Sequence, residues 1–149
     1  MRVVILGCGR VGSRLATDLD KKGHSVGLID IRNEAFQRFL PVDFGGDAVL
    51  GNGIDEDILV RAGLDQADFF FALTQDDNTN IMAAQIAQEI YNVPNVICRI
   101  YDRARNTIYR NLGLQTVAPI ETMASLIRDL VAAGPRRQPP EKSKSQAGG

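Results

Sequence analysis

A glycine-rich motif near the N-terminus has the residue types and spacing best suited to binding a phosphate. Gly7, Gly9 and Gly12 form the pattern G-x-G-x-x-G, which follows an apolar run and leads into a helical pattern. Such glycines permit a tight turn, a close approach of the backbone to a pyrophosphate, and close packing of a helix on a sheet. The helix N-terminus adds unpaired N–H groups and a partial positive charge. We therefore predict a dinucleotide-type phosphate site here rather than a turn without a ligand.

The second feature of the predicted site is an acid at the end of the next apolar run. Asp30 closes the run that begins at Val26, and its carboxylate can accept hydrogen bonds from two ribose hydroxyls. A carboxylate at this position disfavours the 2′-phosphate of NADP, whereas Arg32 nearby favours it, so the two residues leave that choice open. Val11, which lies within the motif, and Ile31, which directly follows the acid, belong to the predicted binding segment.

Further candidates lie where later strands are predicted to end. Asn52 and Gly53 follow a short apolar run, where they serve a ligand site, a turn before the next helix, or both. Thr74 ends an apolar run with three consecutive phenylalanines, which predicts burial on both faces. Arg99 interrupts another apolar run, and burying an unpaired arginine is costly. It should therefore have an anionic partner, either an internal acid or a bound phosphate.

Six apolar runs alternate with helical patterns in two halves of three. This alternation predicts an α/β, Rossmann-like, doubly wound parallel sheet of order 3-2-1-4-5-6 with helices on both faces. Right-handed crossovers then place the site between strands 1 and 4. The predicted strands cover residues 2–6, 26–30, 48–50, 67–74, 96–101 and 115–118. The predicted helices run from Gly12 to Lys22 with Gly23 as cap, from an N-cap at Asn33, from Asp55, from Asp76 to about Glu89, over 102–111, and from Pro119 to Ala132.

The C-terminal part of the chain divides into an apolar helix and a polar tail. Met123, Leu126, Ile127, Leu130 and Val131 give the last helix a broad apolar face. That face serves either ordinary packing on the sheet or dimerisation and docking. Residues 134–149 contain no large apolar residue and are predicted to be disordered, which leaves residues 1–133 as one nucleotide-binding domain.

Composition narrows the class of function. The 149 residues carry a net charge of −1, which gives no electrostatic footprint for nucleic acid. The two cysteines fit reduced cytosolic thiols, and no apolar run is long enough to span a bilayer. Because no second domain, positioned histidine or nucleophile–base pair is visible, we predict a binding module without catalytic residues. The alternative is an NAD-dependent oxidoreductase or a fragment of one.

From Met1 to about Ala133 the chain resembles the KTN domain, the N-terminal nucleotide-binding half of RCK regulators of potassium channels and transporters. Four groups of motifs carry this resemblance and are together more specific than the glycine motif alone. They are G-C-G-R-V-G with L-x-x-x-G-H-x-V and Ile29-Asp30; G-N-G with A-G-L at 62–64 and A-D at 67–68; A-L-T-Q-D-D at 72–77 with Asn78 and Asn80; and C-R-I-Y-D-R, I-Y-R-N-L-G and A-P-I-E at 118–121.

The resemblance implies a cytoplasmic regulatory protein, held at the inner face of the membrane by a potassium channel or transporter subunit. It would assemble as a homodimer or a ring of dimers, sense NAD(H) or an adenine nucleotide (AMP, ADP or ATP), and gate potassium flux. The site residues it implies are Arg10 at the distal phosphates, Asp30 at the adenosine ribose, Arg32 at the adenine or ribose edge, Asn52 and Gly53 on the adenine side, Thr74 and Arg99 on the phosphate or distal side, and Glu121 as a ligand of a divalent cation between subunits.

The sequence departs from the family in two places. Family members usually carry a second, smaller C-terminal subdomain, whereas this sequence ends in a polar tail. We therefore expect either a truncated or a single-lobe member. In addition, Asn52 stands where many relatives carry an acid.

Overall fold

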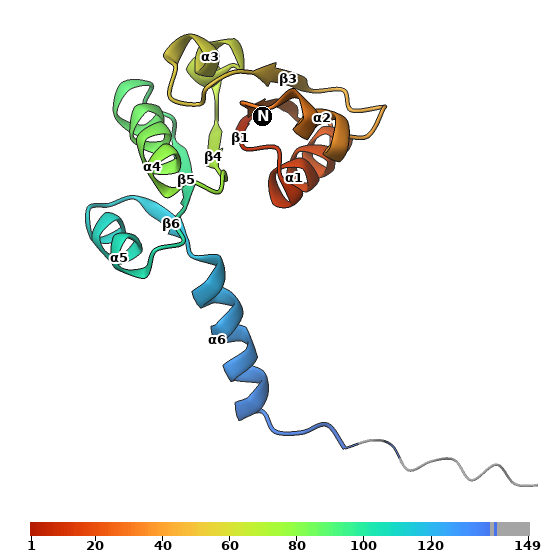
Figure 1. Ribbon diagram of the computed structural model, residues 1–149, viewed down its shortest axis with the longest axis vertical. Helices are drawn as coiled ribbons and strands as arrows, with labels where there is room; N and C mark the ends of the chain where they lie inside the picture. The colour runs from red at the N-terminus through yellow and green to blue at the C-terminus, as the bar shows by residue number, and fades with distance from the viewer. Residues whose placement is uncertain (138, 140–149) are drawn as a thin grey trace, which may run out of the picture.

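A computed structural model describes residues 1–137 and 139. Its centre is a six-stranded, all-parallel sheet in the order β3-β2-β1-β4-β5-β6, with helices on both faces (Figure 1). The Rossmann-like prediction, strand order included, is confirmed. The predicted tail falls mostly outside the described residues, and its disorder stays a prediction.

The elements follow the alternation read from the sequence. The strands are β1 (Arg2–Leu6), β2 (Ser25–Asp30), β3 (Asp47–Leu50), β4 (Phe69–Ala72), β5 (Asn95–Arg99) and β6 (Gln115–Val117). The helices are α1 (Arg10–Lys21), α2 (Asn33–Phe39), α3 (Glu56–Arg61), the 3-10 turn η1 (Leu64–Gln66), α4 (Asp77–Gln85), the π-helical turn η2 (Ile86–Ile90), α5 (Arg103–Asn111) and α6 (Pro119–Ala132). In the described part of the chain, no helix combines the length and hydropathy that a membrane span requires.

Several predicted boundaries are wrong by a few residues, and two of the errors affect the site. Helix α1 begins at Arg10 rather than after Gly12, because the positive φ of Gly7 completes the turn within three residues. The N-cap of α2 is Arg32, not Asn33, which is the first helical residue. The Arg32 N–H donates to the Asp30 carboxylate, so the acid holds the chain as it enters α2.

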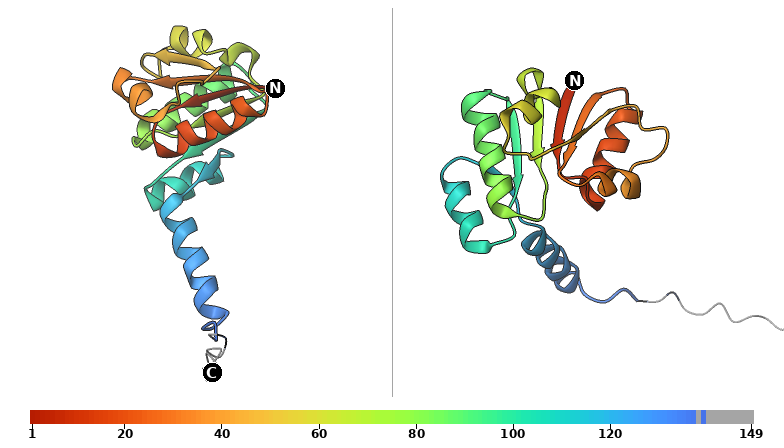
Figure 2. Two further views of the ribbon diagram at one scale, coloured as in Figure 1. Left: turned by 90° about the vertical axis from the view of Figure 1, so that its right-hand side faces the viewer. Right: turned by 45° about the horizontal axis from the view of Figure 1, so that its top comes forward.

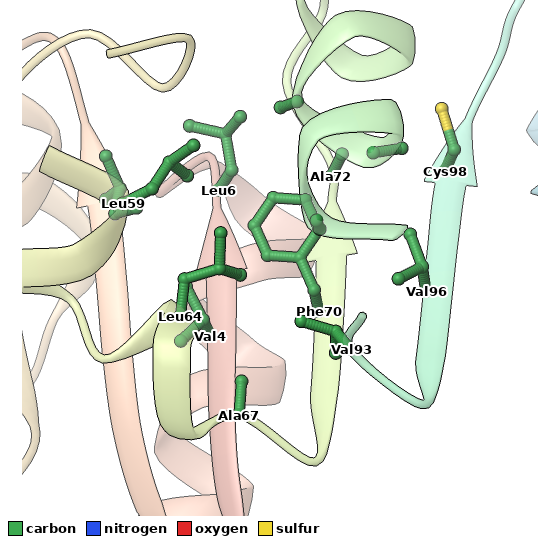
Figure 3. Close-up of a cluster of buried hydrophobic side chains, with 14 of the residues drawn as sticks. Val4, Leu6, Leu59, Leu64, Ala67, Phe70, Ala72, Val93, Val96 and Cys98 are labelled. Carbon is green, nitrogen blue, oxygen red and sulfur yellow. The ribbon is translucent and has the colours of Figure 1, made fainter. Parts of the chain in front are cut away.

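The core has two layers, one on each face of the sheet. Along β1, Val4 and Leu6 face the layer beneath α3 and α4, which Figure 3 shows around Phe70. Val3 and Ile5 face the opposite layer, beneath α1 and α2. Side chains of one strand are thus buried on both sides, as a covered parallel sheet requires.

The prediction that all three phenylalanines of β4 are buried is correct only for the middle one. Phe70 is fully buried, whereas Phe69 and Phe71 are half-buried and stack with ring centroids 5.9 Å apart. The two belong to the layer under α1 and α2. Those helices contact mainly β1 and β2, so they cover this side of β4 only in part.

The last helix lies away from the sheet. Helix α6 projects from the end of β6 and does not pack on the body of the domain (Figures 1 and 2). None of its residues is buried, and those of α5 are likewise half-buried or exposed. The alternative in which α6 packs on its own sheet is therefore wrong. The apolar side chains of α6 are exposed in the single chain, namely Ile120, Met123, Leu126, Ile127, Leu130 and Val131.

Candidate functional site

A cavity of about 780 Å³ opens at the carboxyl ends of the strands, where the strand order reverses between β1 and β4. Ligands of open α/β sheets bind at this kind of switch point. The structure brings twelve of the thirteen predicted site residues together along this one cavity: Gly7, Gly9, Arg10, Val11, Gly12, Asp30, Ile31, Arg32, Asn52, Gly53, Thr74 and Arg99.

The glycine-rich loop forms the floor of the cavity and depends on three different properties of glycine. Gly7 has a φ of +107°, and its N–H donates to the Ile29 carbonyl at 2.7 Å. A Cβ on Gly12 would overlap the Gly7 carbonyl oxygen, so α1 can start this close to the loop only without a side chain. A Cβ on Gly9 would meet no protein atom within 4 Å. The protein itself therefore does not require glycine at position 9, whereas a ligand against the backbone would.

The start of α1 fits a phosphate. Gly9 is the N-cap, and no side chain caps the helix within the described residues. The first N–H groups of a helix have no intrahelical acceptor, and the helix dipole places partial positive charge on them. A phosphate can accept these hydrogen bonds in the space that Gly9 leaves open. The residues present thus fit the pyrophosphate of a nucleotide.

Asp30 lies at the carboxyl end of β2 and is almost fully buried, with 9% of its surface exposed. Its Oδ2 accepts from the Cys8 N–H at 2.9 Å, and its Oδ1 accepts from the Arg32 N–H at 2.9 Å. The Arg32 Nε is 3.8 Å from Oδ1. Since a carboxylate has about four acceptor positions, Asp30 can hold the glycine-rich loop and still accept from a ribose.

The charge around the cavity is suited to an anionic ligand. Four arginines line it, against two aspartates: Arg10, Arg32, Arg38 and Arg99 against Asp30 and Asp76. Hydrogen bonds from the Thr79 hydroxyl and backbone N–H lower the pKa of Asp76, whose carboxylate caps α4. Asp76 is thus committed to its own helix. The arginines outnumber the acids, which favours phosphate groups.

Arg99 does not pair with an internal acid, which was one of the two anionic partners predicted for it. Its Nε and Nη2 donate to the backbone carbonyl of Thr74 at 3.2 and 2.8 Å, and its guanidinium lies 4.9 Å from the centre of the Tyr101 ring. Among the described residues no acid lies within 4.0 Å of it. The prediction that an internal acid pairs with Arg99 is therefore wrong. A neutral carbonyl orients the guanidinium without compensating its charge.

The cavity also contains residues that the sequence reading missed. Tyr101 lies two residues after Arg99, at the end of the predicted strand 96–101, and Arg38 lies on the short helix α2. Gln75 directly follows Thr74, the predicted end of its strand. Its position next to that strand end was the signal that could have identified it. No comparable signal marks Arg38, because its place depends on how α2 turns back over the sheet.

Glu121, the predicted metal ligand, lies outside the cavity. It is exposed in the first turn of α6, where its carboxylate pairs with Arg128 at 2.8 Å. Over residues 1–137 and 139, no group of three or more histidine, cysteine or acidic side chains is placed to hold a metal ion. A cation between subunits stays a prediction.

Comparison with known proteins identifies the family that this fold and cavity indicate. The model of the TrkA-N domain matches residues 3–119, and the chain belongs to this family. It is 45% identical over 135 residues to a Trk system potassium uptake protein TrkA of Streptomyces coelicolor, covering 90% of this chain and 60% of the relative. A TrkA homolog of Pyrococcus horikoshii is 33% identical over 143 residues, covering 90% and 61%. The chain thus spans about three fifths of the length of these two relatives.

Solved structures share the fold. The TrkA-N domain of the inner membrane protein ybaL from Escherichia coli superposes with a TM-score of 0.76 at 21% identity, covering 87% of this chain and 96% of that one. The Kef C-terminal domain of Shewanella denitrificans, described in an AMP-bound form, gives 0.73 at 20% identity, covering 91% and 83%. The GsuK channel bound to NAD gives 0.71 at 24% identity, covering 88% and 23%.

Proposed function

We infer that this chain is a nucleotide-responsive regulatory subunit, or part of one, for potassium uptake. Its ligand is NAD(H) or an adenine nucleotide, held over the glycine-rich loop with the adenosine ribose on Asp30. The observation that carries this proposal is the gathering of twelve predicted residues along one arginine-rimmed cavity. The names of the relatives supply the link to potassium transport.

The class of ligand rests on the chemistry of the cavity. An uncapped helix start and four arginines suit two or more phosphates, and Asp30 suits a ribose with free hydroxyls. Structural neighbours are described as bound to AMP, ADP and NAD, which supports the same class. When bound, such a ligand would supply negative charge beside the arginines of the cavity, at the switch point between the two halves of the sheet.

Regulation requires that the ligand bind two states of the assembly with different affinities. We propose that the chain works at the inner face of the membrane, as a homo-oligomer attached to a potassium channel or transporter subunit. The exposed apolar face of α6 supports an oligomer, because a contiguous apolar surface of this kind marks an interaction site. An exchange of ligand would alter that assembly and thereby the flux of potassium.

The test of ligand binding is a thermal-shift titration with AMP, ADP, ATP, NAD, NADH and NADP, each with and without magnesium. A ligand at about 100 times its dissociation constant stabilises the fold by about 2.7 kcal/mol, which corresponds to several degrees for a domain of this size. We expect selective shifts by NAD(H) or by ADP and ATP. The absence of a shift with every ligand would contradict the proposal, and turnover of a nicotinamide by the chain alone would favour the oxidoreductase alternative.

The link to transport needs a separate experiment. In the organism that carries the chain, deletion of its gene should lower potassium uptake at limiting external potassium. The wild-type gene should restore uptake, whereas an Asp30→Ala allele expressed at the same level should not. Uptake unaffected by the deletion would remove potassium transport from the proposal and leave ligand binding untouched.

A further inference from the structure

The buried side-chain amide of Asn80 links the carboxyl ends of β4 and β5, next to the part of the cavity that Thr74 and Arg99 line. Asn80, in the first turns of α4, is fully buried and makes four hydrogen bonds. Its Oδ1 accepts from the N–H and the hydroxyl of Thr74 at 2.9 and 2.7 Å. Its Nδ2 donates to the carbonyls of Thr74 and Arg99 at 2.8 and 3.0 Å. The side chain thus uses its full capacity of two donors and two acceptors.

The place of Asn80 in the sheet explains why an amide is needed. The ladder between β4 and β5 ends with the pair Ala72 and Cys98, so Thr74 and Arg99 lie beyond it. The Thr74 N–H can only donate, and the carbonyls of Thr74 and Arg99 can only accept. These partners determine the orientation of the amide, and neither a carboxylate nor an aliphatic side chain could satisfy them all. Asn80 therefore replaces ladder hydrogen bonds where the strands separate.

The Thr74 carbonyl is the atom that connects Asn80 to the cavity. It accepts from Asn80 and, at the same time, from Nε and Nη2 of Arg99. This carbonyl and the Tyr101 ring are the two groups that orient the guanidinium at the cavity. The backbone that follows Arg99 is held from the same helix, because the Asp77 carboxylate accepts from the N–H groups of Tyr101 and Asp102 at 2.8 and 3.0 Å.

We propose that Asn80 is a positioning residue for the distal half of the nucleotide site: it fixes the Thr74 carbonyl and thereby aims Arg99 at ligand groups beyond the first phosphate. This inference rests on the proposed function. Asn80 is not among the residues that line the cavity. Its effect is confined to ligands long enough to reach Arg99, whereas a residue that only stabilised the fold would affect all ligands alike.

The experiment compares NAD with AMP on purified Asn80→Ser protein by calorimetric titration. Serine is neutral and too short to reach both carbonyls, so Thr74 and Arg99 lose their common donor. We expect NAD to bind about tenfold more weakly, which is the effect of one or two neutral hydrogen bonds. The affinity for AMP should stay within about threefold of the wild type, since AMP ends at the first phosphate. Equal weakening of both ligands, or of neither, would overturn the proposal.

The matched control is Asn78→Ser, the same change two residues earlier on the same helix. Asn78 is exposed, lies outside the cavity lining and accepts from Arg105 at 2.8 Å. Both affinities should remain unchanged in this variant. A loss of NAD affinity equal to that of Asn80→Ser would overturn the proposal. If the wild type binds none of AMP, ADP, ATP and NAD(H), the proposed function itself fails, which is a different outcome from uniform weakening in the variant.

A double-mutant cycle with Arg99→Met tests whether Asn80 acts through Arg99. Arg99→Met should weaken NAD by about tenfold or more, and adding Asn80→Ser should then cost little, because coupled residues are not additive. Additive losses, or no loss in Arg99→Met, would overturn the proposal. Should Asn80→Ser fail to fold, Thr74→Val removes the hydroxyl bond to Asn80 at 2.7 Å together with the 3.2 Å contacts of that hydroxyl with the Asp76 backbone, and it leaves the backbone bonds of Thr74 to Asn80 in place. This variant should bind NAD severalfold more weakly and keep its affinity for AMP. A loss of AMP affinity with unchanged NAD affinity would overturn the proposal.

Discussion

At the scale of single residues, Asp30 combines a structural and a binding role. Replacing it with alanine leaves the N–H groups of Cys8 and Arg32 without their acceptor. The loss at the buried Cys8 N–H costs about 1–3 kcal/mol. We expect Asp30→Ala to lower the melting temperature by several degrees and to weaken every adenine nucleotide at least tenfold, as measured by thermal denaturation and titration calorimetry.

The control for Asp30→Ala is the other acid of the cavity. Asp76→Ala removes the side-chain N-cap of α4 and so destabilises that helix, but it leaves the ribose position intact. It should lower the melting temperature and spare AMP affinity. If Asp30→Ala also left AMP affinity unchanged, the ribose assignment would be wrong.

The two cysteines give a prediction about pH. Burial, reinforced by the Asp30 carboxylate, raises the pKa of Cys8 from 9.0 to about 11. Burial, reinforced by Asp77, raises the pKa of Cys98 from 9.0 to about 12. Above pH 9 the unfolded thiols lose protons that the folded ones keep, so the free energy of unfolding falls as pH rises from 9 towards 11. Urea denaturation at pH 7, 9 and 10 measures this fall.

The cysteine-free double variant Cys8→Ala and Cys98→Ala provides the comparison. All other titratable groups are common to both proteins. The variant should therefore lose less stability than the wild type between pH 9 and pH 10. Identical pH dependence would contradict the assignment of raised thiol pKa values.

At the scale of the element, we expect two glycines of the loop from β1 to α1 to have different roles: Gly12 is needed for packing, and Gly9 is needed for ligand binding. We expect Gly12→Ala to lower stability, since its Cβ would overlap the Gly7 carbonyl and push α1 away from the loop. Gly9→Ala should melt within about a degree of the wild type, because its extended backbone suits alanine and its Cβ meets no protein atom. The same methyl group should weaken pyrophosphate ligands at least tenfold by blocking their approach.

Melting curves with and without ADP measure both effects of these glycine variants. A stable Gly9→Ala protein that still binds ADP normally would show that the ligand does not lie against this loop. A stable Gly12→Ala protein would show instead that α1 can move away without loss.

The same scale explains how far the sequence could predict the site. The glycine loop and Asp30 are local signals, since each lies directly at the end of its own strand, and the structure places them together. The partner of Arg99 is a backbone carbonyl of another strand, which no residue type reveals. Asn80 lies in the first turns of α4 like many polar residues, and its importance depends on β4 and β5 being neighbours. A sequence pattern does not predict the role of a side chain when that role depends on tertiary contacts.

At the scale of the whole molecule, α6 is the part of the chain that a single domain does not explain. Its large apolar side chains are between 52% and 75% exposed. Burying one such side chain contributes about 1.5–3 kcal/mol, so covering the face with a second copy would supply a stable interface. We expect the wild-type chain to be a dimer or larger in solution, and the double variant Ile127→Lys and Leu130→Lys to be monomeric, as measured by light scattering after size exclusion.

The comparison variant for α6 places the same two charges on its other side. By helical periodicity Ser125 and Ala132 lie opposite the apolar face, and Ser125→Lys with Ala132→Lys should keep the mass of the wild type. Nucleotide binding should survive in both variants, because α6 contributes nothing to the cavity lining. A monomeric wild type would contradict self-association through α6. An Ile127→Lys and Leu130→Lys protein with unchanged mass would place the interface elsewhere, and the apolar face would then need another partner.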